Sequence, residues 1–184
     1  TWIITCKSFA EDGAKGNEIL DKITNSFTID SIDKKEKKKN SPMPFTTSTL
    51  QQVASTKLNM NARKIMSIAQ KLYEGIELAD ETVGLITYMR TDSTRLSNDF
   101  VNETLTFIKN KYGSEYVGRV KVAKKKENVQ DAHEAIRPTS IKRDPISVKP
   151  YLSDDEYKLY RLIYYRALAS LMSEAKTNNT TIVL

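Results

Sequence analysis

The stretch "LSDDEYKLYRLIYYRALASLMSEA" (residues 152–175) predicts the longest helix of this 184-residue chain. It opens with a capping box, because Ser153 can cap the first turn and Glu156, three residues later, can reach back to the cap. Asp154 and Asp155 add negative charge at the positive end of the helix dipole. This stretch favours a fold in which helices dominate.

Three further helices are predicted upstream. "LSNDFVNETLTFIKNKYG" (96–113) has a cap at Ser97 and a stop at Gly113. Its apolar residues at helical spacing are Val101, Leu105, Ile108 and Tyr112. "TSTLQQVASTKL" (47–58) has a capping box, with Ser48 as the cap and Gln51 three residues on.

The next helix, "ARKIMSIAQKLYEG" (62–75), is joined to the one before it by only three residues. Its apolar stripe comprises Ile65, Ala69, Leu72 and Tyr73, and Gly75 can act as the C-cap. Two short amphipathic helices joined this way are a helix-turn-helix candidate. Such hairpins also occur as plain packing units, and the sequence leaves both interpretations open.

Extended segments are predicted at both ends of the chain. Residues 2–7 alternate in polarity, "FTIDSI" (27–32) resembles a strand, and "NNTTIVL" (178–184) enters one. The prolines of "NSPMPF" (40–45) break regular structure and suggest a boundary. The fold class is therefore α+β and mainly helical.

Composition excludes several classes of protein. With 39% hydrophobic and 28% charged residues the chain reads as soluble and globular, and no stretch approaches the ~20 apolar residues that span a bilayer. It lacks the basic and apolar regions of a signal peptide and does not begin with Met, so we expect an excised piece. A single Cys and a single His argue against a zinc site, and Cys6 fits a reducing compartment.

The net charge of +6 has two main sources. "KKEKKK" (34–39) and "RVKVAKKK" (119–126) carry much of the excess. Runs of this kind are commonly solvated loops, and they can also attract phosphate in a salt-dependent way. Charge alone does not choose between the two.

The stretch "GLITYMRTDS" (84–93) places Tyr88 and Arg90 two residues apart. If residues 86–90 are extended, Ile86, Tyr88 and Arg90 share one face. A phenol is a poor nucleophile at neutral pH, whereas a nearby guanidinium favours its anionic form and can bind a phosphodiester. The pattern suits attack on a phosphate, but it is also common in ordinary strands.

The chain's only histidine lies in "DAHEAIRPT" (131–139). If this is one helical turn, His133 and Arg137 face the same way, with Glu134 beside them. A lone histidine is usually structural. Paired with an arginine, it also suits a DNA phosphate, with the arginine supplying charge and the histidine a hydrogen bond or a proton.

Three stretches taken together resemble the bacterial type IA topoisomerases, in the same order and at similar spacing. They are "PFTTSTLQQVASTKL" (44–58), "EGIELADETVGLITYMRTDSTRLS" (74–97) and "AHEAIRPT" (132–139). "LITYMRTDST" resembles the active-site motif of the topoisomerase I branch, because the topoisomerase III branch usually has proline where Met89 stands. The resemblance covers residues 41–184 well and residues 1–40 loosely.

The resemblance implies an ATP-independent mechanism that relaxes negative supercoils. Tyr88 would attack single-stranded DNA and form a 5′-phosphotyrosine link, Arg90 would stabilise the scissile phosphate, and His133 would bind the backbone or move a proton. Asp92 matches an aspartate that hydrogen-bonds this histidine. The implied DNA-binding set is Arg90, Asp92, His133, Glu134 and Arg137.

The resemblance also implies three segments. Residues 1–43 would leave a strand-rich arch domain, residues 44–174 would form the helical domain that carries the tyrosine, and residues 175–184 would return to the arch. The family's Mg²⁺ site lies in a Toprim domain whose "DxDxE" pattern is not found here, so no metal ligands are expected within this chain.

Two functions follow as competing hypotheses. The first is an incomplete topoisomerase, inactive alone, cytoplasmic and nucleoid-associated, whose partners are single-stranded DNA and the missing Toprim and other domains, with no membrane. The second is a non-enzymatic DNA-binding module that uses the helical pair and the lysine runs. The two hypotheses differ in the role of Tyr88.

Overall fold

A computed structural model describes residues 13–22, 28–118 and 133–183. The chain divides into two compact units, one made of Thr1–Lys37 with Thr177–Leu184 and the other of Lys38–Lys176. The predicted strand at residues 2–7 and the basic run at 119–126 lie outside the described residues. The assignment of the terminal segments to an arch domain stays a prediction.

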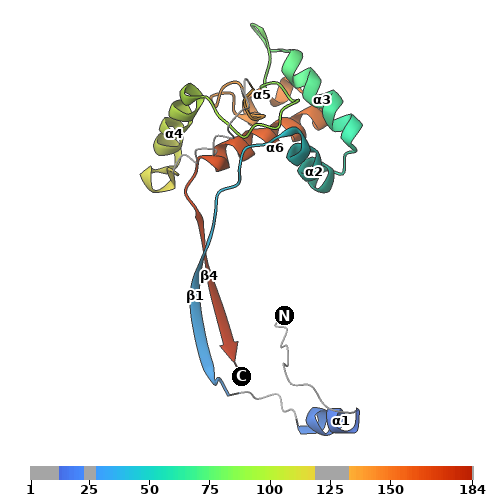
Figure 1. Cartoon of the computed structure of the whole chain (residues 1–184), viewed down its shortest axis with the longest axis vertical. Helices are drawn as coiled ribbons and strands as arrows, with labels where there is room; N and C mark the ends of the chain where they lie inside the picture. Colours follow the sequence, from blue (N-terminus) through green and yellow to red (C-terminus); the bar gives the residue numbers. More distant parts are fainter. Residues whose placement is uncertain (1–12, 23–27, 119–132, 184) are drawn as a thin grey trace, which may run out of the picture. The chain divides into compact units, whose positions relative to one another are not determined.

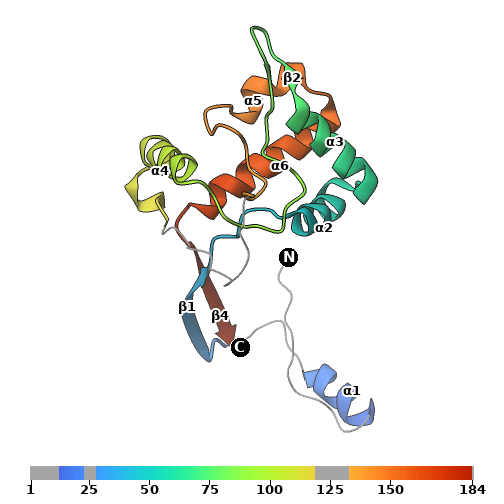
Figure 2. The ribbon, with the colours of Figure 1, turned by 45° about the horizontal axis from the view of Figure 1, so that its top comes forward.

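The larger unit is built from helices, which confirms the predicted mainly helical α+β class. Its α-helices are α2 (Thr47–Leu58), α3 (Ala62–Glu74), α4 (Asn98–Tyr112), α5 (Pro145–Val148) and α6 (Asp154–Ser170). Two short 3₁₀ turns, η1 (Ser114–Tyr116) and η2 (Lys149–Tyr151), follow α4 and α5. Figures 1 and 2 show α6 running through the middle of this group, with α2 and α3 on one side of it and α4 toward its C-terminal end.

The cap at the start of α6 is the one that the sequence predicts. The Ser153 hydroxyl accepts from the backbone N–H of Glu156, whose carboxylate accepts from the N–H of Ser153. The predicted cap of α2 at Ser48 is wrong. Thr46 caps this helix in an extended conformation and forms its capping box with Thr49 rather than Gln51.

The core lies where α2, α3 and α5 pack against α6. Fully buried apolar side chains come from α2, α3 and α6, namely Leu50, Ala54, Ile65, Ala69, Leu72, Leu159 and Ile163. Because the apolar faces of α2 and α3 are used against α6, the structure favours a packing unit for this helical pair. Tyr73 and Tyr112, which sequence spacing placed on buried stripes, are exposed at the ends of their helices.

A small hairpin separates α3 from the tyrosine segment. Strands β2 (Ile76–Glu77) and β3 (Thr82–Val83) pair antiparallel, with Ile76 opposite Val83. The condition that residues 86–90 are extended, on which the shared face of Tyr88 and Arg90 depended, is not met: after a single β-bridge between Ile86 and Pro138 the chain bends. Ile86 and Met89 are buried and Tyr88 is exposed, so the predicted two-residue alternation is not followed.

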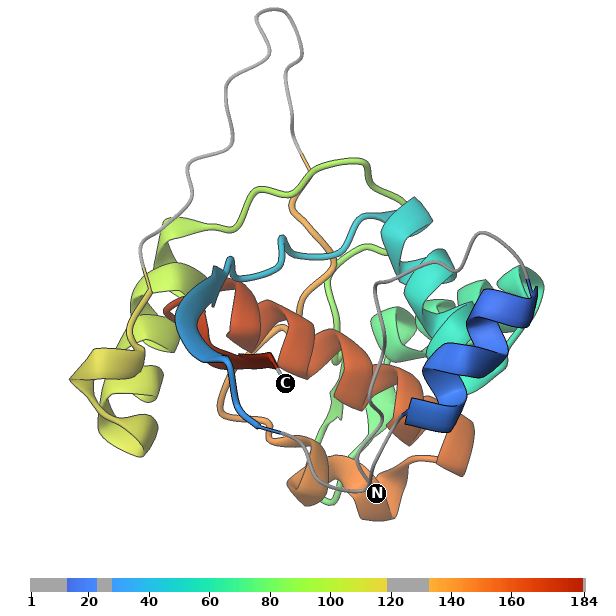
Figure 3. The ribbon, with the colours of Figure 1, turned by 90° about the horizontal axis from the view of Figure 1, so that it is seen from below.

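The smaller unit contains α1 (Gly13–Lys22) and most of a two-stranded sheet formed by β1 (Ser31–Lys39) and β4 (Ala175–Val183). The N–H of Asp30 donates to the carbonyl of Val183, and the Thr177 hydroxyl donates to that of Lys37, so the strands are antiparallel. Figure 3 shows them side by side. The predicted strand at 27–32 is wrong in its bounds, because pairing with β4 makes the exposed lysine run itself extended.

None of the helices in the described ranges is both long and apolar enough to cross a membrane.

Candidate active site

Tyr88 lies on a segment that neighbouring elements hold on both sides. The N–H of Leu85 donates to the carbonyl of Leu72 at 2.7 Å, which ties the segment to the end of α3. Further along, Thr47 at the start of α2 donates its hydroxyl to the carbonyl of Met89 at 2.8 Å and accepts from the N–H of Thr91 at 2.9 Å. These bonds fix the backbone before and after the exposed tyrosine.

Residues 133–138 are extended, so the predicted helical turn in "DAHEAIRP" is wrong. The backbone N–H groups bond across to other segments instead of within a turn: that of Ala135 donates to Arg95, and that of Ile136 to Phe45. Thr87 and Arg137 bond to each other, with the N–H of Thr87 donating to the Arg137 carbonyl at 2.9 Å. Tertiary hydrogen bonds thus replace the helical ones, and the predicted i, i+4 pairing of His133 and Arg137 does not arise.

The hydrogen bonds between Thr87 and residues 135–137 bring Tyr88 and His133 together. Their ring centroids are 5.8 Å apart, with an angle of 32° between the ring planes. Tyr73, at the end of α3, also contacts the Tyr88 ring. The two rings are edge to face, with centroids 5.4 Å apart and planes at 67°. Sequence reasoning paired Tyr88 with His133 through the family resemblance but missed Tyr73.

Tyr73 is absent from the predicted site because its spacing placed it on a buried stripe. It precedes Tyr88 by 15 positions, with the β2–β3 hairpin between them, and only closure of that hairpin brings the two rings into contact. One feature of the sequence could have indicated that Tyr73 is exposed. It lies at the end of the predicted helix, where a residue of the apolar stripe can remain at the surface.

Arg90 and Asp92 are both exposed. Because the chain bends here, a common face for Tyr88 and Arg90 does not follow from strand geometry. No hydrogen bond or ion pair joins Arg90, Asp92 or His133 to another described side chain, and the implied Asp92–His133 hydrogen bond is not formed. Their DNA-binding roles stay predictions.

Glu134 and Arg137 form an ion pair that is largely covered, with Arg137 Nε donating to Glu134 Oε2 at 2.7 Å. The guanidinium also donates to the Ser97 hydroxyl at 3.2 Å and to the Pro138 carbonyl at 2.9 Å, and it stacks on the Phe100 ring at 4.4 Å. Partial burial by itself raises the pKa of Glu134, but the hydrogen bond and charge of Arg137 outweigh it and hold that pKa below its ordinary value.

This pair therefore joins the histidine segment to the start of α4. The structure gives Arg137 a structural task in addition to the DNA-binding role that the resemblance implies, and that role stays a prediction.

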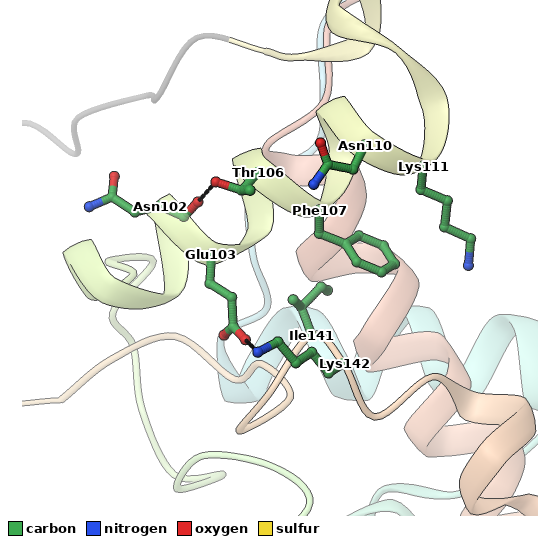
Figure 4. Close-up of a pocket in the computed structure, with 8 residues that line it drawn as sticks. All are labelled: Asn102, Glu103, Thr106, Phe107, Asn110, Lys111, Ile141 and Lys142. Atoms are coloured by element: carbon green, nitrogen blue, oxygen red, sulfur yellow. Dashed lines mark hydrogen bonds and ion pairs between the residues drawn. The ribbon is translucent and has the colours of Figure 1, made fainter.

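A groove with a volume of about 600 Å³ lies away from the tyrosine, between α4 and residues 141–142 (Figure 4). Phe107 and Ile141 form its apolar floor. Both lysines at its rim are ion-paired, Lys111 with Asp144 at 3.4 Å and Lys142 with Glu103 at 3.6 Å. It offers little uncompensated charge to a phosphate.

Across the described ranges, no three His, Cys, Asp or Glu side chains cluster closely enough to hold a metal ion. The arrangement around Tyr88 thus offers an exposed phenol with a histidine ring beside it. It offers no carboxylate cluster through which a Mg²⁺ ion would act.

The "TYMRTDS" segment therefore holds an exposed tyrosine, in ring contact with a histidine, on a helical domain. The family model described as DNA topoisomerase matches residues 6–184, and the chain belongs to that family. This confirms the resemblance that the sequence indicated.

Among solved structures, the chain is similar to topoisomerase I from Thermotoga maritima. The two are 39% identical, with a TM-score of 0.79, and the match covers 97% of this chain. It covers 28% of the Thermotoga maritima chain, so this chain spans just over a quarter of that protein's length.

Proposed function

We propose that this chain is the tyrosine-bearing part of a type IA topoisomerase. The whole enzyme cleaves and rejoins single-stranded DNA through Tyr88 and relaxes negative supercoils in the cytoplasm, at the nucleoid, whereas this chain alone is inactive. The observation that carries the proposal is the exposed Tyr88, in contact with His133, within a chain of this family.

The reaction is a transesterification and needs no ATP. The Tyr88 phenol gives up its proton and its oxygen forms a bond to phosphorus, while the bond from phosphorus to the 3′ oxygen breaks and that oxygen takes up a proton. The reverse attack by the 3′-hydroxyl reseals the strand and frees the phenol. The energy of the broken bond is kept in the phosphotyrosine link.

Each neighbouring residue has a role in this proposal. The exposed guanidinium of Arg90 binds the phosphate and offsets the charge that builds up at phosphorus. His133, whose ring touches that of Tyr88, contacts the DNA backbone or moves a proton. A Toprim domain outside this chain would hold the Mg²⁺, which would supply further neutralisation of the phosphate charge.

Covalent capture of DNA tests the assignment of Tyr88. The host is Thermotoga maritima topoisomerase I with its matching segment replaced by residues 6–184. A single-stranded oligonucleotide labelled at its 3′ end should become covalently attached to the protein, because the 5′ phosphate of the downstream product stays on the tyrosine. Tyr88→Phe should remove at least 99% of this adduct, since phenylalanine has no oxygen to attack with.

The matched control is Tyr116→Phe, which changes a tyrosine of similar exposure in η1. It should leave the adduct unchanged. An adduct that persists at full level in Tyr88→Phe would show that Tyr88 is not the nucleophile. The alternative, a DNA-binding module without catalysis, predicts DNA binding by the chimera with no adduct at any tyrosine.

A further inference from the structure

Two large aromatic rings meet at the surface of the larger unit. Tyr73 and Tyr88 are 42% and 38% exposed, yet each contacts the other edge to face at 5.4 Å. Aromatic pairs favour this geometry because the positive edge of one ring meets the negative face of the other. The contact therefore restrains the orientation of Tyr88 without burying its phenol.

The backbone beneath Tyr73 cannot shift independently of the tyrosine segment. Leu72 and Leu85 are both fully buried, and the hydrogen bond between their backbones measures 2.7 Å. Gly84 and Tyr73, the neighbours of this bonded pair, are also close: a Cβ added to Gly84 would lie 2.5 Å from the carbonyl oxygen of Tyr73. The end of α3 and the segment leading to Tyr88 are thus in direct backbone contact. The backbone that carries the Tyr73 ring is therefore held in place.

Tyr88 consequently has ring neighbours on two different segments, Tyr73 on α3 and His133 on the extended segment. Its own backbone is fixed by Thr87, which bonds to Arg137. With the backbone fixed, the rotation of the side chain decides where the phenol oxygen points. The two ring contacts restrain this rotation.

We propose that Tyr73 is a positioning residue for Tyr88. Its ring holds the Tyr88 side chain in the rotamer from which the phenol oxygen attacks phosphorus. This inference rests on the proposed function of Tyr88. Because the contact is made between rings, phenylalanine at position 73 keeps the effect, and an aliphatic side chain loses it.

The geometry is tested first on the full chain alone. In protein labelled with ¹³C in its tyrosine rings, the Tyr88 signal is assigned by its loss in Tyr88→Phe. Tyr73→Leu should shift that signal, because the ring current of Tyr73 is removed, and Tyr73→Phe should keep it near its original position. Tyr112→Leu is the matched control, since it breaks another edge-to-face pair, with Phe107, at a 38% exposed tyrosine. An unmoved Tyr88 signal in Tyr73→Leu would overturn the contact.

The consequence is tested on the chimera with the oligonucleotide in excess. Tyr73→Leu should lower the single-turnover cleavage rate constant about 10- to 100-fold, as expected for a misplaced reacting group. The dissociation constant for the oligonucleotide should stay within about twofold of that of the unaltered chimera. The separate variant Tyr73→Phe should keep the unaltered cleavage rate. Tyr73→Met is a second variant in case Tyr73→Leu does not fold, with the same expectation.

Two results would overturn the proposal. One is an unchanged cleavage rate in Tyr73→Leu. The other is weaker binding with an unchanged rate, which would make Tyr73 a surface on which a base stacks. Both are separate from failure of the proposed function, which shows as an adduct that persists in Tyr88→Phe.

Discussion

At the scale of single residues, the site combines exposed groups with covered ones that hold them. Tyr88, Arg90 and His133 are exposed and available to a ligand. Glu134 and Arg137, one and four residues after the histidine, are largely covered and bonded to each other. Residues that a single motif places together therefore differ in what they contact. Of the residues named here, the Glu134–Arg137 pair is the one whose contacts contribute to the stability of the fold.

The ion pair between Glu134 and Arg137 predicts a pH-dependent stability. The pKa of Glu134 is lower in the folded chain than its ordinary value, so the unfolded state binds the proton more tightly. The stabilisation is therefore fully present above about pH 4.5 and is lost as the pH falls through the folded-state pKa. Glu134→Gln should lower the free energy of unfolding at pH 7 by about 1–3 kcal/mol, because it leaves a covered guanidinium without its carboxylate.

Urea denaturation at pH 7 and pH 3.5 measures this effect, and the difference between Glu134→Gln and the unaltered chain should shrink at the lower pH. Glu103→Gln is the control, because its pair with Lys142 is longer and more exposed. A loss of stability in Glu134→Gln that is the same at both pH values would exclude the ion pair as its cause.

At the scale of elements, the position of the tyrosine depends on joints between helices and irregular segments. The 84–91 segment is tied at one end to the last turn of α3 and at the other to the first turn of α2. In the middle it bonds to residues 135–139, where the N–H of Thr139 donates to the carbonyl of Leu85 at 3.0 Å. Hydrogen bonds thus hold the segment along its length without a strand's regular pairing.

The joint at α3 depends on a glycine. Gly84→Ala would place a methyl group 2.5 Å from the carbonyl oxygen of Tyr73, so the two backbones must move apart. We expect the free energy of unfolding to fall by about 1–3 kcal/mol, as for other overpacked sites. Thermal and urea denaturation followed by circular dichroism measure the change.

Gly13→Ala is the control for this variant, because a Cβ at Gly13 meets nothing within 4 Å. It should leave the stability unchanged or raise it slightly, since alanine favours helix over glycine. If Gly84→Ala were as stable as Gly13→Ala, the close approach of the two segments would not exist in solution.

At the scale of the whole molecule, charge and length set what the chain can do. It carries a net charge of +6 and spans 28% of the length of the Thermotoga maritima enzyme that it matches. The lysine run at 34–39 lies on an exposed strand, which keeps its ammonium groups at the surface. Electrostatic attraction to a nucleic acid is therefore expected of this chain even without catalysis.

We predict weak, salt-dependent binding of the 184-residue chain to single-stranded DNA. If about four phosphates are neutralised, the logarithmic slope against salt is about −2.8, and affinity falls about 50-fold between 50 and 200 mM salt. Fluorescence anisotropy with a labelled oligonucleotide measures the slope. Replacing the five lysines of residues 34–39 with glutamine should make the slope shallower, and an affinity that does not change with salt would refute the prediction.

Local features of this chain were readable from its sequence. The C-terminal end of α2, the bounds of α3, the capping box of α6 and the ends of α4 follow from caps, glycines and apolar spacing, which act within a few residues. The family followed from three separate stretches taken together. The cap of α2 was missed because Thr46 and Ser48 are chemically equivalent candidates and only the backbone conformation separates them.

Wherever backbone hydrogen bonds go to distant partners, only the tertiary structure decided the outcome. "DAHEAIRP" reads as a helical turn, but its described residues 133–138 form no helix, because the N–H groups of Ala135 and Ile136 find acceptors at Arg95 and Phe45. The lysine run has no apolar alternation and becomes a strand because β4 lies beside it. Tyr73 reaches Tyr88 only after a hairpin closes between them. The sequence by itself determined which residues are candidates for the chemistry, and the long-range contacts decided which of them touch.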